Sequence, residues 1–314
     1  MTTTLTRGRA RAEAARTATR PPGGALRRSL ARNLRAHAFL IGALLCFALF
    51  TWYPMVREIV MSFQKVRYGE THWVGFDNFR QIFADPEFWP AWRHTLEFTG
   101  VALVFGFVAP FVSAIVINEF RHAQSYLRAL VYLPVMLPPV AGILLFKYFM
   151  DPGYGLFNQI LHALHLPTSS WLASQDTAMF SLVIVSTWAN MGSATLVYLA
   201  ALQSIPGELY EAAELDGAGV LRRIWHVTVP QTRLILSLML MLQVVATMQM
   251  FTESFVLTGG GPQGSTTTVV YLLYNYAFSY DKFNTAAALG VVLLLVLGCF
   301  SAVYLWLERR GGEE

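Results

Sequence analysis

Charged residues are scarce in this chain: they make up 13% of its 314 residues, whereas hydrophobic residues make up 55%. A soluble domain of this length carries about 25% charged residues. So few charges cannot cover the surface of a water-soluble globule, and the exterior must be largely apolar. Lipid is the solvent that fits this composition and the mean hydropathy of +0.45.

Cysteines and catalytic groups are also scarce. Cys46 and Cys299 both fall inside apolar runs and specify neither a disulfide framework nor a metal site. The chain lacks G-x-S-x-G, H-E-x-x-H and any intramembrane pair of carboxylates, which argues against an intramembrane protease or a lipid-modifying enzyme. His162 and His165 have no third ligand nearby in sequence, so solvated histidines are favoured over a metal site. We predict no catalytic residue, no metal and no cofactor.

One segment imitates a nucleotide site but lacks its essential charge. Residues 259–266 (GGGPQGST) follow the phosphate-loop pattern G-x-x-x-x-G-K-[ST], except that Ser265 stands where lysine belongs. That lysine supplies positive charge to the terminal phosphates of a nucleotide. The segment also follows a predicted span on the outer side, away from cytoplasmic ATP. We interpret it as a Gly/Pro turn where the chain leaves the membrane.

Long apolar runs are the main feature that is present. A helix crosses the hydrocarbon core with about 20 mostly apolar residues. Six segments meet this requirement: 37–63, 95–118, 127–149, 178–202, 232–257 and 285–307. Prolines at positions 110, 134, 138 and 139 interrupt backbone hydrogen bonding and predict kinks in the second and third. We predict an all-α membrane protein whose six transmembrane helices form one domain, residues 36–310.

Positive charge is concentrated at the N-terminal end. Nine arginines lie before residue 36, so we expect residues 1–35 to be a disordered cytoplasmic tail. Such a run could bind nucleic acid, but no nucleic-acid-binding fold accompanies it, and we predict no such partner. With the N-terminus inside, sixteen of the 23 Lys and Arg residues are cytoplasmic and seven are outside. This asymmetry predicts a multi-pass protein of the cell membrane with both termini in the cytoplasm.

The cytoplasmic segment between the fourth and fifth spans, residues 203–231, is too apolar for a solvated loop and too short for a domain. Pro206 suits the first turn of a helix, and Gly217 and Gly219 suit its end. One narrow face of this helix has i, i+3, i+4, i+7 spacing and consists of Leu209, Ala212, Ala213 and Asp216. The small alanines would let a partner approach closely, so a short helix braced between two spans suits the transmission of force.

This segment resembles the EAA loop of permease subunits in ATP-binding-cassette (ABC) importers. Residues 211–213 (EAA), Gly217 and residues 227–230 (VTVP) follow the family spacing E-A-A-x3-G-x9-I-x-L-P, with valine replacing isoleucine and leucine. Sugar-importer permeases of the maltose and glycerol-phosphate kind are similar in four further stretches: 74–79 (VGFDNF), 202–206 (LQSIP), 215–218 (LDGA) and 257–262 (LTGGGP). The resemblance covers everything beyond about Arg35.

The resemblance implies a type I ABC importer permease, which is not itself an enzyme, with a cytoplasmic coupling helix between spans four and five. The residues implied in contact with a separate ATPase are Glu211, Ala212, Ala213, Asp216 and Gly217. The implied partners are a second related permease, two cytoplasmic ATP-binding subunits or domains, and an extracytoplasmic solute-binding protein. Membrane lipid surrounds the spans. The expected role is to form the path for a carbohydrate-class solute and to couple its passage to ATP hydrolysis.

Polar residues inside predicted spans suggest where that path runs, because they are costly in lipid and usually face the bundle interior. Two stripes, on spans four and five, consist of Ser186, Asn190 and Ser193, and of Gln249 and Glu253. Their positions resemble the sugar-contacting faces of maltose-type permeases. The alternative is that Asn190, Ser193 and Gln249 hydrogen-bond between helices.

Three alternatives to a sugar permease are another solute, a membrane enzyme and a stand-alone transporter. Within the importer class, the solute could be glycerol phosphate, a peptide or an amino acid. A membrane enzyme is disfavoured by the lack of a catalytic cluster. A stand-alone secondary transporter would not need an ATPase-docking loop and would commonly show internal repeats. The sequence favours a sugar-class permease without choosing the sugar.

Overall fold

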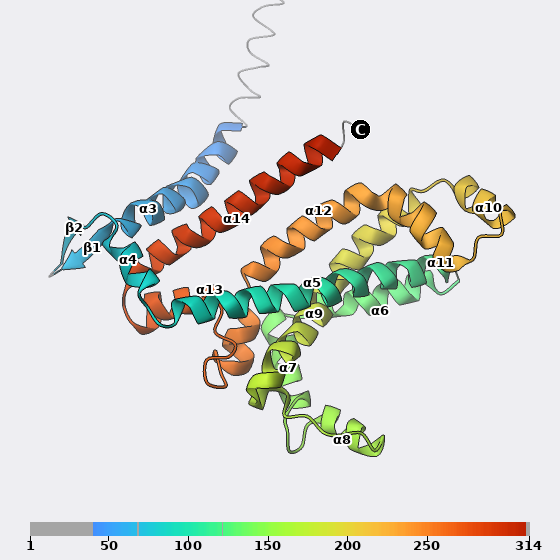
Figure 1. Cartoon of the computed structure of the whole chain (residues 1–314), viewed down its shortest axis with the longest axis horizontal. Coiled ribbons are helices and arrows are strands. Elements are labelled where there is room, and N and C mark those ends of the chain that lie inside the picture. Colours follow the sequence, from blue (N-terminus) through green and yellow to red (C-terminus); the bar gives the residue numbers. More distant parts are fainter. Residues whose placement is uncertain (1–39, 68, 121, 312–314) are drawn as a thin grey trace, which may run out of the picture. The chain divides into compact units, whose positions relative to one another are not determined.

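The computed structural model describes residues 40–67, 69–120 and 122–311 (Figure 1). The Arg-rich tail predicted to be disordered lies outside these residues. The chain divides between Arg57 and Glu58 into two compact units, and the predicted path and coupling residues all belong to the second.

Among the described residues, five helices are long and apolar enough to cross a membrane. They are Leu40–Ser62, which ends in α3 (Tyr53–Ser62); α5 (Phe88–Glu119); α9 (Gln175–Gln203); Val220–Met248, which comprises α11 (Val220–Arg223), a π-helical turn (Ile224–Thr228) and α12 (Val229–Met248); and α14 (Phe283–Gly311). Their lengths and apolar character match the predicted all-α membrane fold.

The third predicted span is broken rather than kinked. α6 (Gln124–Met136) and α7 (Pro139–Phe149) meet at 96°. The break follows from the sequence, because Pro138 forces the preceding Leu137 out of the helical region to a ψ of 146°. Taken as one broken span, the pair brings the number of spans to the predicted six. Pro110, by contrast, lies within the continuous helix α5.

Two other spans differ from their predicted limits. α5 begins at Phe88 instead of residue 95, because its first turns pack in a cluster of buried residues with α13 (Val269–Tyr274) and α14. The fifth span begins at Val220, inside the predicted cytoplasmic loop, and its helix ends at Met248. Helical structure resumes only at Thr252, before a π-helical turn over Ser254–Thr258.

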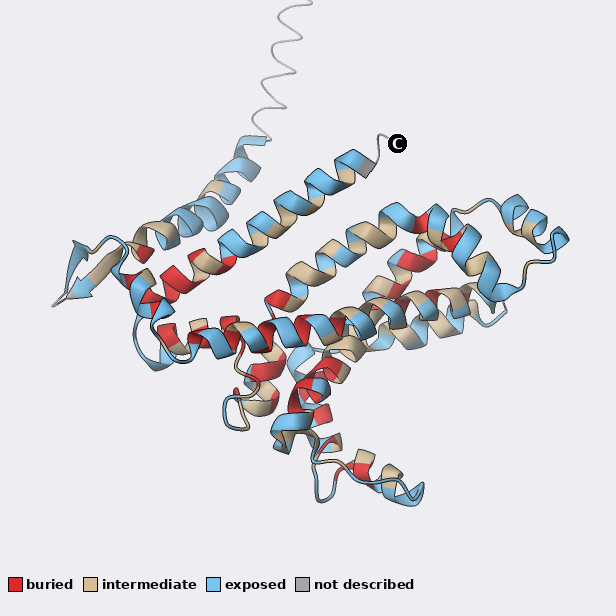
Figure 2. Ribbon diagram, in the orientation of Figure 1, coloured by how far each residue is buried: buried red, intermediate tan, exposed pale blue. Residues whose placement is uncertain are grey.

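Helix α5 is the central element of the core. Its residues belong to three clusters of buried side chains: Phe88 packs with α13 and α14, Phe98 with α7 and α9, and Ile117 with the C-terminal end of α9. Figure 2 shows buried residues along α5 and α9 and at the start of α14. Elements distant in sequence are thus positioned against one helix.

The remaining elements are short. The antiparallel hairpin of β1 (Gln64–Arg67) and β2 (Glu70–Trp73) pairs Gln64 with Trp73. α4 (Asp77–Phe83) follows it, and the Asn78 amide donates hydrogen bonds of 2.8 Å to the carbonyls of Ser62 and Gln64. α8 is Leu156–Ala163, and α10 is Gly207–Leu215.

A tyrosine in a further π-helical turn, Asn275–Ser279, fixes the chain before α14. The Tyr276 hydroxyl donates a 2.7 Å hydrogen bond to Oδ2 of Asp85. Burial, reinforced by this hydrogen bond, raises the pKa of Tyr276, so the hydroxyl keeps its proton and remains a donor.

Helices α6 and α9 approach until their backbones touch at Gly192. A Cβ built on Gly192 would lie 2.6 Å from the carbonyl oxygen of Val131 and 2.9 Å from Cγ2 of Val135. Small residues allow this close packing in membrane bundles, where van der Waals contact drives helix association.

We expect Gly192→Ala to lower the yield of folded protein in the membrane, because the added methyl group must push α6 away from α9. The measurement is the amount of monodisperse protein recovered in mild detergent. Gly298→Ala is the matched control, since a Cβ there meets nothing within 4 Å. Equal recovery of the two variants would contradict this packing.

Candidate functional site

A cavity of about 430 Å³ lies among α5, α9, α12 and the segment that follows α12. All five predicted path residues line it: Ser186, Asn190, Ser193, Gln249 and Glu253. Its volume falls in the ~300–1,000 Å³ range of small-molecule sites. The fold therefore brings the polar residues of spans four and five to one place.

Gln249 and Glu253 line the cavity, but they do not form the single helical stripe that the sequence predicts. Gln249 caps the C-terminus of α12, the chain is non-helical at Met250 and Phe251, and Glu253 belongs to the next helical segment. They therefore flank a break and do not share one helical face. Non-helical backbone at membrane depth is tolerated where it is buried in protein or lines a water-filled cavity. The break is consistent with a polar passage.

Hydrogen bonding distinguishes the two interpretations of the amides. Asn190 donates to the carbonyl of Ser186 at 2.9 Å, and Gln249 donates to that of Val245 at 3.0 Å. Each partner lies four residues earlier on the same helix. Neither amide therefore joins two helices within the described chain.

Unlike Asn190 and Gln249, the amide of Gln243 joins two helices. Its Nε2 donates to the carbonyl of Ala102 on α5 at 2.7 Å. Gly106 makes the room, because a Cβ there would clash with the same nitrogen. Gln243, Thr187 and Thr247 also line the cavity, and none of the three is among the predicted path residues. The i, i+4 spacing of Gln243 and Thr247 was the available signal.

The turn after span five, residues 259–268, closes around threonine side chains. Thr266 shares a 2.7 Å hydrogen bond with the hydroxyl of Thr258, and its carbonyl accepts a 2.6 Å bond from Ser254. Gly259, Gly260 and Gly264 all have positive φ. The segment is thus the predicted Gly/Pro turn, and it follows a π-helical turn where a phosphate loop would follow a strand.

The turn is also tied to the helix break. The buried side chain of Thr268 donates a 2.9 Å hydrogen bond to the carbonyl of Met250. Thr95 on α5 accepts a 2.9 Å bond from the backbone N–H of Val269. The turn after span five therefore pairs the Met250 carbonyl, which the break leaves without a helical partner.

The predicted coupling residues lie on and just after α10, where a Schellman motif ends the helix. The N–H of Ala218 donates to the carbonyl of Ala213, and the N–H of Gly217 donates to that of Glu214, both at 2.9 Å. Gly217 has a φ of +75°, which glycine adopts without steric cost. The predicted helix end is confirmed at this position.

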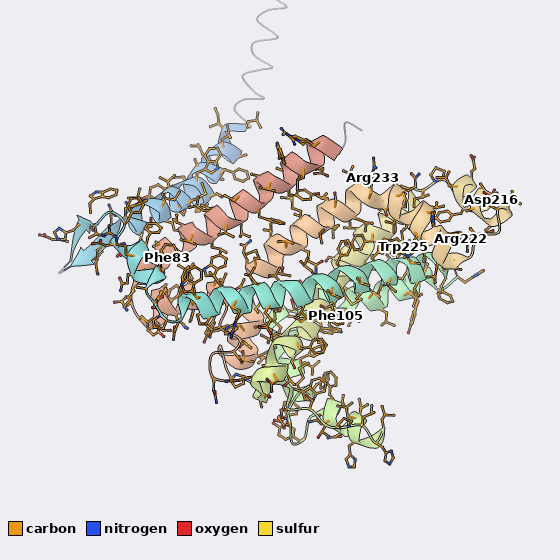
Figure 3. The ribbon with its side chains drawn as sticks, in the orientation of Figure 1. Phe83, Phe105, Asp216, Arg222, Trp225 and Arg233 are labelled. Atoms are coloured by element: carbon orange, nitrogen blue, oxygen red, sulfur yellow. The ribbon has the colours of Figure 1, made fainter. Side chains whose placement is uncertain are left out.

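One face of α10 packs toward the membrane domain and the opposite face is free. Tyr210 and Glu214 contact residues at the start of span five, as described below. Ala212 lies about 200° around the helix from Tyr210, at 100° per residue, and is exposed, as are Glu208, Leu209 and Asp216. Figure 2 shows α10 largely exposed, and Figure 3 shows Asp216 at its end.

The two candidate metal ligands do not form a site. His162 lies in α8 and His165 follows it at a φ of +59°, and both side chains are exposed. In the described part of the chain, no three metal-ligating side chains come together.

Comparison with known proteins defines the class. Residues 102–311 match the family described as binding-protein-dependent transport system inner membrane component. The chain belongs to this family, whose members are permeases of ABC transporters and are not enzymes themselves. The cavity, the α10 loop and the apolar helices thus belong to an inner membrane permease.

Individual relatives are similar over most of their length. The probable ABC transporter permease YurN of Bacillus subtilis (strain 168) is 32% identical over 88% of this chain and 97% of its own. The trehalose/maltose permease MalF of Thermococcus litoralis is 32% identical over 82% and 85%. A chain of a bacterial ABC transporter that imports the acidic polysaccharide alginate has a TM-score of 0.81, with 26% identity over 91% and 98%.

We expect Gly217→Ala to loosen the end of α10, because a non-glycine residue in the left-handed conformation costs about 1–2 kcal/mol. No atom lies within 4 Å of the added Cβ, so the cost is conformational. The measurement is hydrogen exchange at the N–H groups of residues 217 and 218, which should quicken. Gly219→Ala is the matched control, since Gly219 has a φ of −67° and equal space. Unchanged protection in Gly217→Ala would contradict the strain.

Proposed function

We propose that this chain is the transmembrane permease subunit of an ABC importer for a carbohydrate-class solute. The observation that carries the proposal is the polar cavity at the helix break, lined by every path residue picked from the sequence. Membership of the permease family supports the transport role. The sugar class is supported by relatives named for trehalose and maltose and, in Bacillus subtilis, for arabinooligosaccharides.

The charge of the cavity favours a neutral sugar over glycerol phosphate. Among the described residues that line it, Glu253 is the one ionisable side chain and none is Lys or Arg. A phosphate ester would need a cationic or N–H-rich partner and would be repelled by a carboxylate. Amides, hydroxyls and one carboxylate instead suit the hydroxyl groups of a sugar.

The solute would pass between spans four and five, with Asn190 and Gln249 as contact residues. Each amide is positioned by a bond from its nitrogen to its own helix, so its carbonyl oxygen is free to accept from a sugar hydroxyl. Ser186 and Ser193 would add hydroxyls on the same wall. Glu253 would accept further bonds beyond the break.

We assign the coupling role to the free face and end of α10. Glu211, Ala212, Ala213, Asp216 and Gly217 would contact one of two cytoplasmic ATP-binding subunits. A second related permease would complete the path, and an extracytoplasmic binding protein would deliver the solute. That last partner is supported by the related alginate transporter, whose structure includes a periplasmic protein bound to an alginate pentasaccharide. Lipid would cover the remaining apolar surface.

The proposed orientation places both termini and α10 in the cytoplasm, and α8 and the turn over 259–268 outside. The distribution of Lys and Arg supports it.

Truncation of the path amides tests the solute site. We expect Asn190→Ala and Gln249→Ala each to raise the apparent KM for uptake by up to about tenfold, because a neutral hydrogen bond contributes about 0.5–1.5 kcal/mol. Uptake kinetics of the assembled transporter, with two sugars of different size, provide the measurement.

Gln243→Ala is the comparison variant, since that amide joins two helices. It should lower the yield of assembled complex, whereas the yields of Asn190→Ala and Gln249→Ala should stay normal. If those two variants instead lose yield while their kinetics per complex are unchanged, they are structural residues and the site assignment is wrong.

Cysteine labelling tests the orientation. In a background without Cys46 and Cys299, an impermeant thiol reagent on intact cells should label His162→Cys and should leave Glu208→Cys unlabelled until lysis. Both positions are exposed, so accessibility depends on the side of the membrane. Ready labelling of Glu208→Cys in intact cells would reverse the proposed topology.

A further inference from the structure

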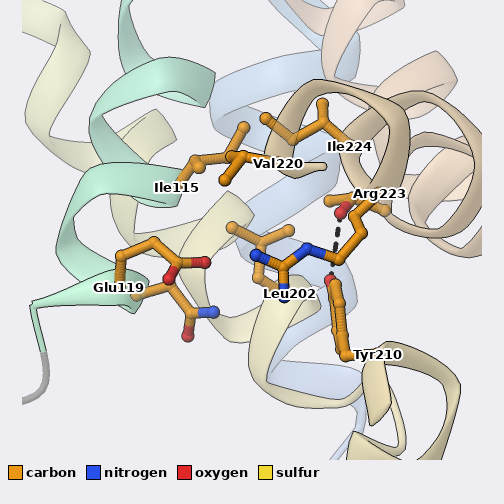
Figure 4. Close-up of a pocket in the computed structure, with 9 residues that line it drawn as sticks. Ile115, Glu119, Leu202, Tyr210, Val220, Arg223 and Ile224 are labelled. Carbon is orange, nitrogen blue, oxygen red and sulfur yellow. Dashed lines mark hydrogen bonds between the residues drawn. The ribbon is translucent and has the colours of Figure 1, made fainter. Parts of the chain in front are cut away.

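Two side-chain contacts hold α10 against the start of the fifth span, Val220–Met248. The hydroxyl groups of Tyr210 and Thr228 share a hydrogen bond of 3.0 Å, and Glu214 forms an ion pair with Arg223. Figure 4 shows the first of these and the position of Arg223 beside Leu202. Tyr210 and Glu214 are four residues apart and therefore lie on the same face of α10.

The partners of these residues are anchored in the membrane domain. Thr228 is buried, and its carbonyl accepts a 2.8 Å bond from the hydroxyl of Thr232 in α12. The side chain of Arg223 is 19% exposed, whereas that of Glu214 is 62% exposed. An ion pair with one mostly buried member is screened less than a pair at the surface.

Arg223 also adjoins the end of α5. It lines a small cavity with Asn118 and Glu119, which are the last two residues of that helix. The C-terminus of a helix carries partial negative charge, and Glu119 adds a full one.

Without these contacts, α10 would be joined to the domain by two short connections. Ser204–Pro206 precedes it, and the turn over 216–219, which contains Gly217 at positive φ, follows it. Such connections allow a helix to pivot. The two contacts prevent this pivot by fixing one face of α10 to the first turns of span five.

We propose that Tyr210, Thr228, Glu214 and Arg223 form a bracket that makes α10 and span five move as one body. This inference rests on the proposed coupling function. Displacement of α10 by the ATPase would then reach the break at 249–251 and the cavity beside it. The four residues are positioning residues, because the bracket contacts neither the solute nor the free face of α10.

The test measures solute uptake and ATP hydrolysis together, in proteoliposomes that contain the complete transporter with its binding protein. Arg223→Ala should raise the number of ATP molecules hydrolysed per solute several-fold, and Tyr210→Phe should do so to a smaller extent. Both rates are expressed per assembled complex, so a loss of folded protein does not alter the ratio. Arg222→Ala is the matched control, because Arg222 is exposed and forms no ion pair among the described residues.

Charge exchange separates a pairing role from a merely structural one. Glu214→Arg and Arg223→Glu should each uncouple hydrolysis from uptake, and the double exchange should bring the ratio back toward that of the wild type. A double exchange that fails to do so overturns the role of the ion pair.

The outcomes also separate the bracket from the function on which it rests. A wild-type ratio in both Arg223→Ala and Tyr210→Phe overturns the bracket alone. A wild-type complex whose uptake does not depend on ATP overturns the proposed function and the bracket with it.

Discussion

Peptide groups in hydrocarbon must find their hydrogen-bond partners within the protein, and the architecture of this chain depends on that constraint. Long helices satisfy it without outside help. Where the chain leaves the helix at Met250, the carbonyl of that residue accepts a bond from Thr268, which lies 18 residues later. The break is possible because a neighbouring segment supplies the partner.

The same break gives the cavity its character. An unbroken helix would present Gln249 and Glu253 as one stripe, whereas the break separates them along the cavity wall. The threonine-rich turn after span five holds the far side of the break in place through Ser254 and Thr266. The geometry of the cavity is thus linked to that turn.

The N-terminal end of span five is connected to this cavity by continuous helix. Val220–Met248 has 29 residues, which at 1.5 Å per residue makes a rod about 43 Å long. The bracket joins α10 to one end of the rod, and the break lies at the other. A helix transmits displacement along its axis with little loss, so the arrangement suits the coupling of two distant sites.

The sequence by itself determined the class of this protein. Runs of about 20 apolar residues predict membrane-spanning helices. Gly217 ends α10 because it adopts a left-handed backbone conformation that other residues avoid. Polar residues within those runs had to face a common interior, which is why all five path residues reach the cavity. Local chemistry was sufficient in each case.

Only the tertiary structure decided how these parts meet. Gln243 finds its acceptor on Ala102, 141 residues away, and Thr268 finds Met250 because the turn after span five folds back. The break in span five and the pairing of Glu214 with Arg223 likewise depend on how segments approach. Spacing along one helix cannot reveal such contacts, because their partners are set by the packing of other elements around α5.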